Sequence, residues 1–444
     1  MFKYIFAFLI CVASLQAQTF NEAKMDSLFN LIESNHKGMG SFSIFSNGEE
    51  VYQKSFGFSN VATNEKANNL TKYRIGSISK TFTATIIMQL VEEGKVTLST
   101  LLSDYFPSIP NADKITIEDL LRHRSGLFNI TETEDLRAWV EKPQSREKMI
   151  ERIIANGTNF EPNEKTQYSN TNFVLLSFIA EDIENKDFSN ILDTRIIKPL
   201  QLKRTEYGKP INPKDNEALP YVFENSEWKE IKLQTDMSIP MGAGAIVSTA
   251  TELNQFFTNL FSGKLISTES LEAMKNAKEG MGLGLMKLPF EEKEVYGHGG
   301  SIDGFQSFAA YFPEDNVSIA LTTNNLYTQV SGIFIGAVKT YFGMECTLPD
   351  FSPKETIEVT SEELDKYLGT YSSPNFPIDI YITKDGNTLI AQGEGQPSFP
   401  LDAIGPDIFY SENVMITLTF QPEEKKMLVD QGGQTYELTK NKKE

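Results

Sequence analysis

The order of the periodic segments constrains the fold of this chain most strongly. Strand-like runs occur on both sides of a long, mostly helical region, residues 101–270, and helical patterns flank these runs. This order predicts an α/β (α+β) sandwich, in which helices flank an antiparallel sheet. The strand-like runs are residues 41–45, 51–56, 296–312 and 317–323, and the flanking helical patterns are residues 20–37 and 330–342.

The composition changes at Pro349 to Pro353, and short β-like runs dominate the chain beyond this point. Asp385-Gly386 and Gly432-Gly433 are typical of hairpin turns between such runs. We therefore predict a large domain at residues 18–348, a linker at 349–360 and a small antiparallel β-barrel at 361–444. No catalytic constellation is evident in the predicted barrel.

The first 17 residues are typical of a cleaved secretory leader. Lys3 precedes an apolar run that is too short to span a bilayer, and the segment ends at the small residue Ala17. The mature chain is expected to be exported, either periplasmic or secreted, with no transmembrane segment. Cys346 is then the remaining cysteine, so we expect no internal disulfide.

The acidic balance of the chain limits its partners. The formal net charge is -19, which argues against nucleic acids and anionic membrane surfaces as partners. The sequence contains no P-loop or nucleotide fingerprint, and no histidine or cysteine pair has metal-ligand spacing. We therefore predict neither a cofactor nor a metal, and the expected partner is a small-molecule or peptide substrate.

Ser77-Ile78-Ser79-Lys80 opens a pattern that predicts an amphipathic helix ending near Gly94. On a helix, a serine and a lysine at this spacing lie on one face, one turn apart. The lysine can take the serine proton only where burial or another cation lowers its pKa. The spacing alone is weak, because an exposed polar helix start has the same pattern.

Tyr168-Ser169-Asn170 precedes a predicted helix at residues 173–183. A tyrosine can move protons between a nucleophile and a leaving group, and the amide of Asn170 can bond a substrate amide. A surface loop with a helix cap would give the same triplet.

His298-Gly299-Gly300-Ser301 lies in a predicted strand, where glycines permit the close approach of a ligand backbone. The Ser301 N–H could form one half of an oxyanion hole and the Ser77 N–H the other half. A glycine-rich strand end with a satisfied histidine is the alternative.

The three motifs in this order resemble those of the penicillin-recognising serine hydrolases. The resemblance is to the branch of class C β-lactamases, D-alanyl-D-alanine carboxypeptidases and S12 peptidases, and it spans Phe20 to Gly343. Thr116 to Leu127 is similar to the family's LLTHTSGL segment, and Met241 to Ala250 is similar to its AGGLVSTA segment. The C-terminal β-domain resembles the lipocalin-like barrels of some relatives, which implies shielding of the site or an oligomer formed through this domain.

The resemblance implies an acyl-enzyme mechanism on a D-amino-acid peptide, a peptidoglycan fragment or a small ester. His298 stands where β-lactamases usually have lysine, which puts carboxylate recognition and β-lactam hydrolysis in doubt. A true β-lactamase and a catalytically silent penicillin-binding sensor or scaffold remain the alternatives. The residues implied are Ser77 as nucleophile, Lys80 and Tyr168 as base and acid, and Asn170, His298, Gly300 and Ser301 as substrate-binding residues.

Overall fold

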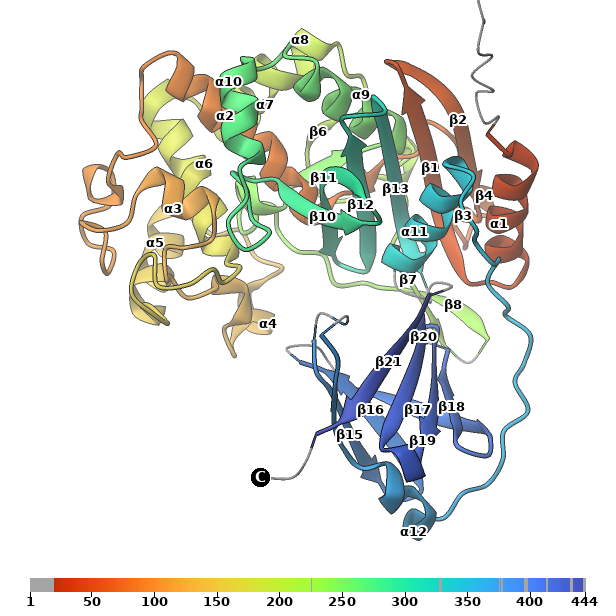
Figure 1. Ribbon diagram of the computed structural model, residues 1–444. Helices are drawn as coiled ribbons and strands as arrows, with labels where there is room; N and C mark the ends of the chain where they lie inside the picture. The colour runs from red at the N-terminus through yellow and green to blue at the C-terminus, as the bar shows by residue number, and fades with distance from the viewer. Residues whose placement is uncertain are drawn as a thin grey trace, which may run out of the picture.

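The computed structural model describes residues 20–441, apart from residues 225, 327–329, 375, 377, 395–397, 413 and 432–433. The predicted leader at residues 1–17 and the predicted Gly432-Gly433 turn lie outside the described residues. A mixed α/β body and a smaller β-barrel make up the described chain, and residues 342–360 connect them along the outside of the molecule (Figure 1).

The central sheet is antiparallel, as the order of the segments predicted. Its strands lie in the order β10-β11-β12-β13-β1-β2. Strand β13 pairs with β1, so the N-terminal hairpin and the later strands form one sheet. These strands are β1 (Gly38–Ser46), β2 (Glu49–Phe56), β10 (Met286–Phe290), β11 (Lys293–Ile302), β12 (Phe305–Phe312) and β13 (Val317–Leu326).

Helices cover both faces of this sheet, because apolar side chains alternate between the faces. Along β12, Ala309 and Tyr311 join the core shared with the helical region, whereas Ala310 and Phe312 join the opposite core. Helices α1 (Glu22–Ser34) and α11 (Val330–Tyr341) cover this second core on the side away from the helical region (Figure 1). The predicted sandwich architecture is therefore confirmed.

The helical region forms the other cover of the sheet, and the described part also contains short strands. Its helices are α2 (Ser79–Glu92), α3 (Ile117–Leu121), α4 (Leu136–Trp139), α5 (Arg146–Asn156), α6 (Asn170–Glu184), α7 (Phe188–Leu192), α8 (Lys198–Leu200), α9 (Ala250–Phe261) and α10 (Thr268–Lys275). The short strands are β3 (Phe58–Asn60), β4 (Glu65–Lys66), β5 (Tyr73–Arg74), β6 (Glu206–Tyr207), β7 (Tyr221–Glu224), β8 (Glu227–Glu230) and β9 (Ile246–Ser248).

Helix α2 differs from its prediction, because it is buried on all sides rather than amphipathic. Every residue from Ser79 to Met88 is buried. The threonines of this helix bond buried carbonyl oxygens: Thr81 donates to Gly284 O at 2.9 Å and Thr83 to Gly242 O at 2.7 Å. Buried hydroxyl groups with such partners are satisfied without solvent, so the helix runs through the core.

Residues 296–312, predicted as one strand, form a hairpin instead. The chain turns at Asp303 and Gly304, whose φ angles are 52° and 88°. Two residues with positive φ are the mark of a type I′ turn, for which Asp-Gly is a favoured pair. This turn starts two residues after Ser301, where β11 has just ended, and therefore helps to fix the position of that residue.

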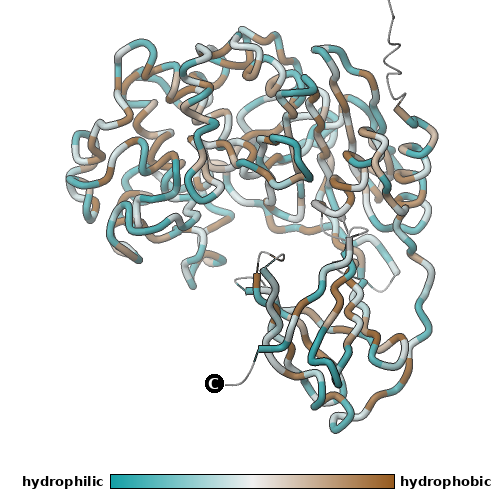
Figure 2. Tube along the Cα trace, in the orientation of Figure 1, coloured by the Kyte–Doolittle hydropathy of each residue, from teal (hydrophilic) through white to brown (hydrophobic). Residues whose placement is uncertain are grey.

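The C-terminal barrel is closed, and its strands are antiparallel. Buried and partly exposed residues alternate along its strands, as in β19, and Figure 2 shows the matching alternation in hydropathy. Strand β17 contains Pro400, a residue that is rare inside strands because it cannot donate to the ladder. The elements are α12 (Ser361–Leu364), β14 (Gly369–Ser372), β15 (Ile380–Asp385), β16 (Thr388–Gly393), β17 (Phe399–Gly405), β18 (Ile408–Ser411), β19 (Ile416–Gln421), β20 (Lys426–Gln431) and β21 (Gln434–Lys440).

The barrel contacts the larger body beside α1 and β1. Lys37 and Glu412 form an ion pair with 2.5 Å between Nζ and Oε1, and Met415 packs against the core beneath α1 and α11. In the described part of the chain, no helix combines the length and the apolar character needed to cross a membrane.

Candidate active site

The turn before α2 places Ser77 beside Lys80. Ser77 lies in a 3-10 turn, Gly76–Ile78, rather than in α2 itself. Gly76 has a φ of 50°, and a Cβ there would lie 2.7 Å from the Ser301 backbone nitrogen, so both conformation and space favour glycine. The helix that follows carries Lys80, whose Nζ lies 3.0 Å from Ser77 Oγ.

Lys80 is fully buried and meets three oxygen atoms. Its Nζ lies 3.0 Å from Ser77 Oγ, 2.7 Å from Asn170 Oδ1 and 2.8 Å from Ala243 O. None of these partners is a carboxylate. Burial therefore holds the pKa of Lys80 well below its usual range, because the ammonium form loses its hydration without gaining a countercharge.

Tyr168 approaches the same oxygen from the loop before α6. Its hydroxyl donates to Ser77 Oγ at 2.7 Å. Burial raises the pKa of Tyr168 well above its usual value, so the phenol keeps its proton at neutral pH.

The hydrogen atoms of this group can be counted. A neutral Lys80 amine has two hydrogens, which its contacts with Asn170 Oδ1 and Ala243 O use. Because Tyr168 donates to Ser77 Oγ, the Ser77 hydroxyl hydrogen is free to point at the Lys80 lone pair. Every hydrogen then has an acceptor, and the Ser77 proton faces a base.

Asn170 is held on both sides at the start of α6. Its Nδ2 donates to Thr131 Oγ1 at 2.8 Å, and its backbone N–H donates to Asn129 Oδ1 at 3.0 Å. The sequence analysis assigned no role to Thr131, Asn129 or the Ala243 carbonyl. The available signal was local, since Asn129 follows the family-like segment that ends at Leu127.

His298 is buried in β11 and is neutral at pH 7. Its Nδ1 lies 2.5 Å from Gly299 O, and because a carbonyl only accepts, Nδ1 must carry the hydrogen. Burial lowers the pKa of His298 to about 4. The ring centroid lies 6.2 Å from that of Tyr168, and the neutral imidazole leaves Nε2 unprotonated.

Strand β11 lies directly against the turn that carries Ser77. A Cβ on Gly300 would meet Ile75 O at 2.0 Å, and Ser307 of the neighbouring strand donates to the same oxygen at 2.8 Å. Pairing between β10 and β11 ends at Gly297, so the following residues of β11 lack a strand partner on that edge among the described residues. Ser301, which is exposed, lies in this part of β11.

A buried ion pair also ties the two segments together. Arg74 Nη1 bonds Asp303 Oδ2, and both side chains are almost fully buried. Asp303 also accepts from the backbone N–H and the hydroxyl of Thr235, the latter at 2.6 Å. The pair therefore connects Arg74, three residues before Ser77, with Asp303, two residues after Ser301. It is not evident from the sequence, because the two residues are far apart in the chain.

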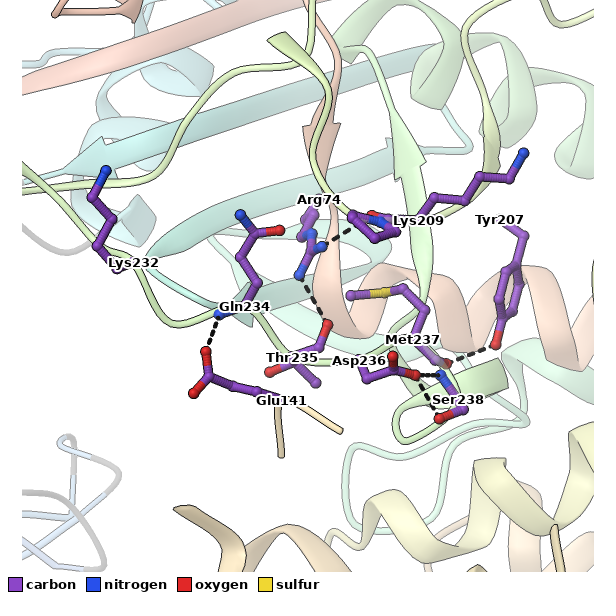
Figure 3. A pocket seen from close by; sticks show the side chains of 12 residues that line it. Arg74, Glu141, Tyr207, Lys209, Lys232, Gln234, Thr235, Asp236, Met237 and Ser238 are labelled. Atoms are coloured by element: carbon purple, nitrogen blue, oxygen red, sulfur yellow. Dashed lines mark hydrogen bonds between the residues drawn. The ribbon is translucent and has the colours of Figure 1, made fainter. Parts of the chain in front are cut away.

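A cavity of about 530 Å³ lies beside this ion pair (Figure 3). Arg74 contributes to its lining, whereas Ser77 does not. Charged side chains of both signs surround it, including Glu141, Lys209 and Lys232. In the described residues, no cluster of three or more His, Cys, Asp or Glu side chains is arranged to hold a metal ion.

Comparisons with known proteins identify a family and several relatives of the chain. The family described as Beta-lactamase matches residues 30–335. PbpX of Bacillus subtilis (strain 168), a protein named for penicillin binding, is 27% identical over 287 residues, which are 64% of this chain and 70% of that protein.

Two solved structures extend the comparison. The D-amino acid amidase of Ochrobactrum anthropi SV3, complexed with L-phenylalanine amide, is 25% identical with a TM-score of 0.63, covering 71% of this chain and 96% of that chain. The octameric penicillin-binding protein homologue of Pyrococcus abyssi is 24% identical with a TM-score of 0.66. The match covers 94% of this chain and 99% of that chain, so the shared fold includes the barrel. The chain belongs to the Beta-lactamase family of penicillin-recognising enzymes and is a serine hydrolase.

Proposed function

We propose that this protein is an exported serine hydrolase in which Ser77 forms an acyl-enzyme with an amide or ester substrate. The observation that carries the proposal is the pair of contacts at Ser77 Oγ, 3.0 Å to Lys80 Nζ and 2.7 Å to the Tyr168 hydroxyl. A buried base on one side and a proton donor on the other are what a serine nucleophile requires.

The first step is acylation. Neutral Lys80 takes the Ser77 proton while Oγ forms a bond to the substrate carbonyl carbon. The oxyanion is then stabilised by the backbone N–H groups of Ser77 and Ser301, a proposal supported by the close packing of Gly76 against Ser301. Tyr168 donates a proton to the leaving group as its bond to carbon breaks, and it recovers a proton from the Lys80 ammonium.

The second step is hydrolysis of the acyl-enzyme. A water molecule gives up its proton to the same Lys80 and Tyr168 pair and attacks the ester carbon. Ser77 Oγ leaves with a proton, which restores the resting network. Asn170, already held by Thr131 and Lys80, keeps one amide hydrogen available for a substrate carbonyl.

The neutral His298 favours an uncharged substrate group at this position. With a pKa of about 4, its ring offers a hydrogen-bond acceptor rather than a positive charge. Amides and esters of D-amino acids therefore suit the site better than peptides ending in a carboxylate or than penicillins. The likeness to a D-amino acid amidase supports this choice.

Two alternatives have support of their own. The relative named for penicillin binding favours a true β-lactamase or a penicillin-binding sensor. The complete network around Ser77 counts against a silent scaffold, since a scaffold would not need it. The barrel contacts the catalytic body beside α1, and we propose that it shields the site or mediates assembly.

Intact-mass spectrometry of the mature protein tests the proposal. The protein is treated separately with a fluorophosphonate and with a penicillin, and hydrolysis of D- and L-phenylalanine amide is followed in parallel. A fluorophosphonate adduct with D-amide turnover, both absent from Ser77→Ala, is the expected result. A stable penicillin adduct without amide turnover supports the sensor, rapid penicillin turnover supports the β-lactamase, and no adduct with either reagent overturns the proposal.

A further inference from the structure

His123 is a buried histidine to which the steps above assign no part. It follows α3 and is 3% exposed, with a left-handed φ of 58°. Asparagine, aspartate and histidine are the side chains that tolerate this conformation best after glycine. The contacts of this buried histidine lie around Tyr168.

His123 holds the residues on both sides of Tyr168. The backbone N–H of Gln167 donates to His123 O at 2.9 Å. The backbone N–H of Ser169 donates to His123 Nδ1 at 3.1 Å. One residue therefore fixes the peptide before Tyr168 with its main chain and the peptide after it with its side chain.

The imidazole ring also supports the phenol ring directly. The His123 and Tyr168 ring centroids lie 4.3 Å apart with an angle of 29° between the planes. The Phe173 ring packs against the imidazole with 5.2 Å between the ring centroids, so the His123 ring has little freedom to move. The stacked phenol carries the hydroxyl that lies 2.7 Å from Ser77 Oγ.

The bond from Ser169 defines the state of the imidazole. Because Nδ1 accepts a hydrogen bond, the ring is neutral and carries its hydrogen on Nε2. Burial holds the pKa of His123 well below its usual value, and the nearby Lys80 and His298 act in the same direction. Tyr168 is the remaining titratable group in contact, and it is protonated at neutral pH.

We infer that His123 is a positioning residue that holds the Tyr168 hydroxyl in line with Ser77 through a backbone clamp and a ring stack. The inference rests on the proposed role of Tyr168 as proton carrier. It assigns to His123 no contact with substrate. Misplacement of a catalytic group by about 1 Å can lower a rate ~10²-fold, which sets the expected size of the effect.

The test separates the clamp from the stack. His123→Asn keeps an acceptor near the position of Nδ1 and tolerates the left-handed backbone, but it removes the ring. His123→Phe keeps a ring and removes the acceptor. His36→Asn is the matched control, because His36 also has a left-handed φ of 54° and a stacked ring, on Phe223 at 6.1 Å.

The measured quantity is the single-turnover acylation rate with p-nitrophenyl acetate, together with the ester concentration at half saturation. We expect His123→Phe to lower the rate about 10²-fold and His123→Asn to lower it less, with half saturation unchanged. His36→Asn should behave as the wild type. Thermal melts verify that each variant is folded. If one of the two His123 variants is unfolded, the acylation rate of the other tests the inference.

A double-mutant cycle with Tyr168→Phe decides between positioning and general support. If His123 acts through the Tyr168 hydroxyl, His123→Asn has little further effect once that hydroxyl is gone. An undiminished effect in the Tyr168→Phe background, or wild-type rates in both His123 variants, overturns the inference. Unchanged acylation in Ser77→Ala, or no acylation by the wild type, would instead show that the proposed function itself is wrong.

Discussion

Lys72 and Lys80 lie on either side of Ser77, and the protein buries both, yet it gives them opposite surroundings. Lys72 is 2% exposed and Lys80 is 0% exposed. The Lys72 ammonium bonds Glu206 and lies 2.6 Å from Asp215 Oδ2, with Glu217 at 3.9 Å. Among the described residues, the hydrogen-bond partners of the Lys80 amine are a hydroxyl, an amide oxygen and a backbone carbonyl.

The difference shows that partners, rather than burial, decide the charge of a buried lysine. Burial alone would lower the pKa of Lys72, but its bonds to Asp215 and Glu206 outweigh this effect and raise the pKa. The pKa of Lys80 falls because nothing opposes the burial. The first lysine is thus a structural cation, and the second is suited to be a base.

Replacing the base should give the largest effect. Lys80→Met keeps the length and the apolar stem of the side chain but removes the nitrogen that faces Ser77. We expect the acylation rate to fall by ~10³-fold or more, near the upper range for loss of a general base. Single-turnover release of p-nitrophenol measures it, and a rate within tenfold of the wild type would assign the base to another group.

Giving Lys80 a carboxylate should make it behave like Lys72. Asn170→Asp places a negative charge where Oδ1 now lies 2.7 Å from Nζ. The carboxylate favours the ammonium form and raises the pKa of Lys80, so the base is protonated at neutral pH.

We expect Asn170→Asp to lower activity at neutral pH about 10²-fold and to recover part of it as the pH rises. A pH–rate profile checks this result. Asn170→Ser is the control, because it removes the amide without adding a charge, and an equal, pH-independent loss in both variants would contradict the charge argument.

The structural lysine should show its effect in stability instead. Lys72→Met leaves the Glu206, Asp215 and Glu217 carboxylates without their shared cation. We expect the free energy of unfolding to fall by about 1.5–3 kcal/mol, toward the lower end because two of the carboxylates are partly exposed. Urea unfolding measures the loss, and acylation by the folded variant should stay at the wild-type rate.

The residues that form the site are easier to predict from the sequence than the partner residues that surround them. Ser77, Lys80, Tyr168 and Asn170 stand out by type and spacing, and the structure joins them by hydrogen bonds. The order of the strands also predicted the central sheet. Both depend on local periodicity and short motifs, which a single sequence displays directly.

The parts that were missed depend on contacts between distant segments. Helix α2 is buried on all sides, and the buried carbonyl oxygens that accept from Thr81 and Thr83 belong to the distant residues 284 and 242. The Arg74–Asp303 pair, the Ala243 carbonyl and the clamp by His123 likewise join segments far apart in the chain. Such partners become visible only when the fold brings them together.

The most direct comparison of the two lysines lies in how stability depends on pH. The native pKa of Lys80 is below the unfolded value of 10.5, so between these values the unfolded chain binds one more proton at this residue. The contribution of Lys80 to stability therefore rises with pH in this window. Lys72 has a native pKa above 10.5, so its contribution is fully present below 10.5 and is lost only as the pH rises through the native pKa.

The two substitutions should therefore separate in urea unfolding at several pH values. The stability of the wild type minus that of Lys80→Met should increase by about 1.4 kcal/mol per pH unit between the lowered native pKa and about pH 10. The corresponding difference for Lys72→Met should stay constant over the same range. A flat difference for Lys80→Met would mean that Lys80 keeps its proton in the native protein, and Tyr168 or His298 would then have to take the proton of Ser77.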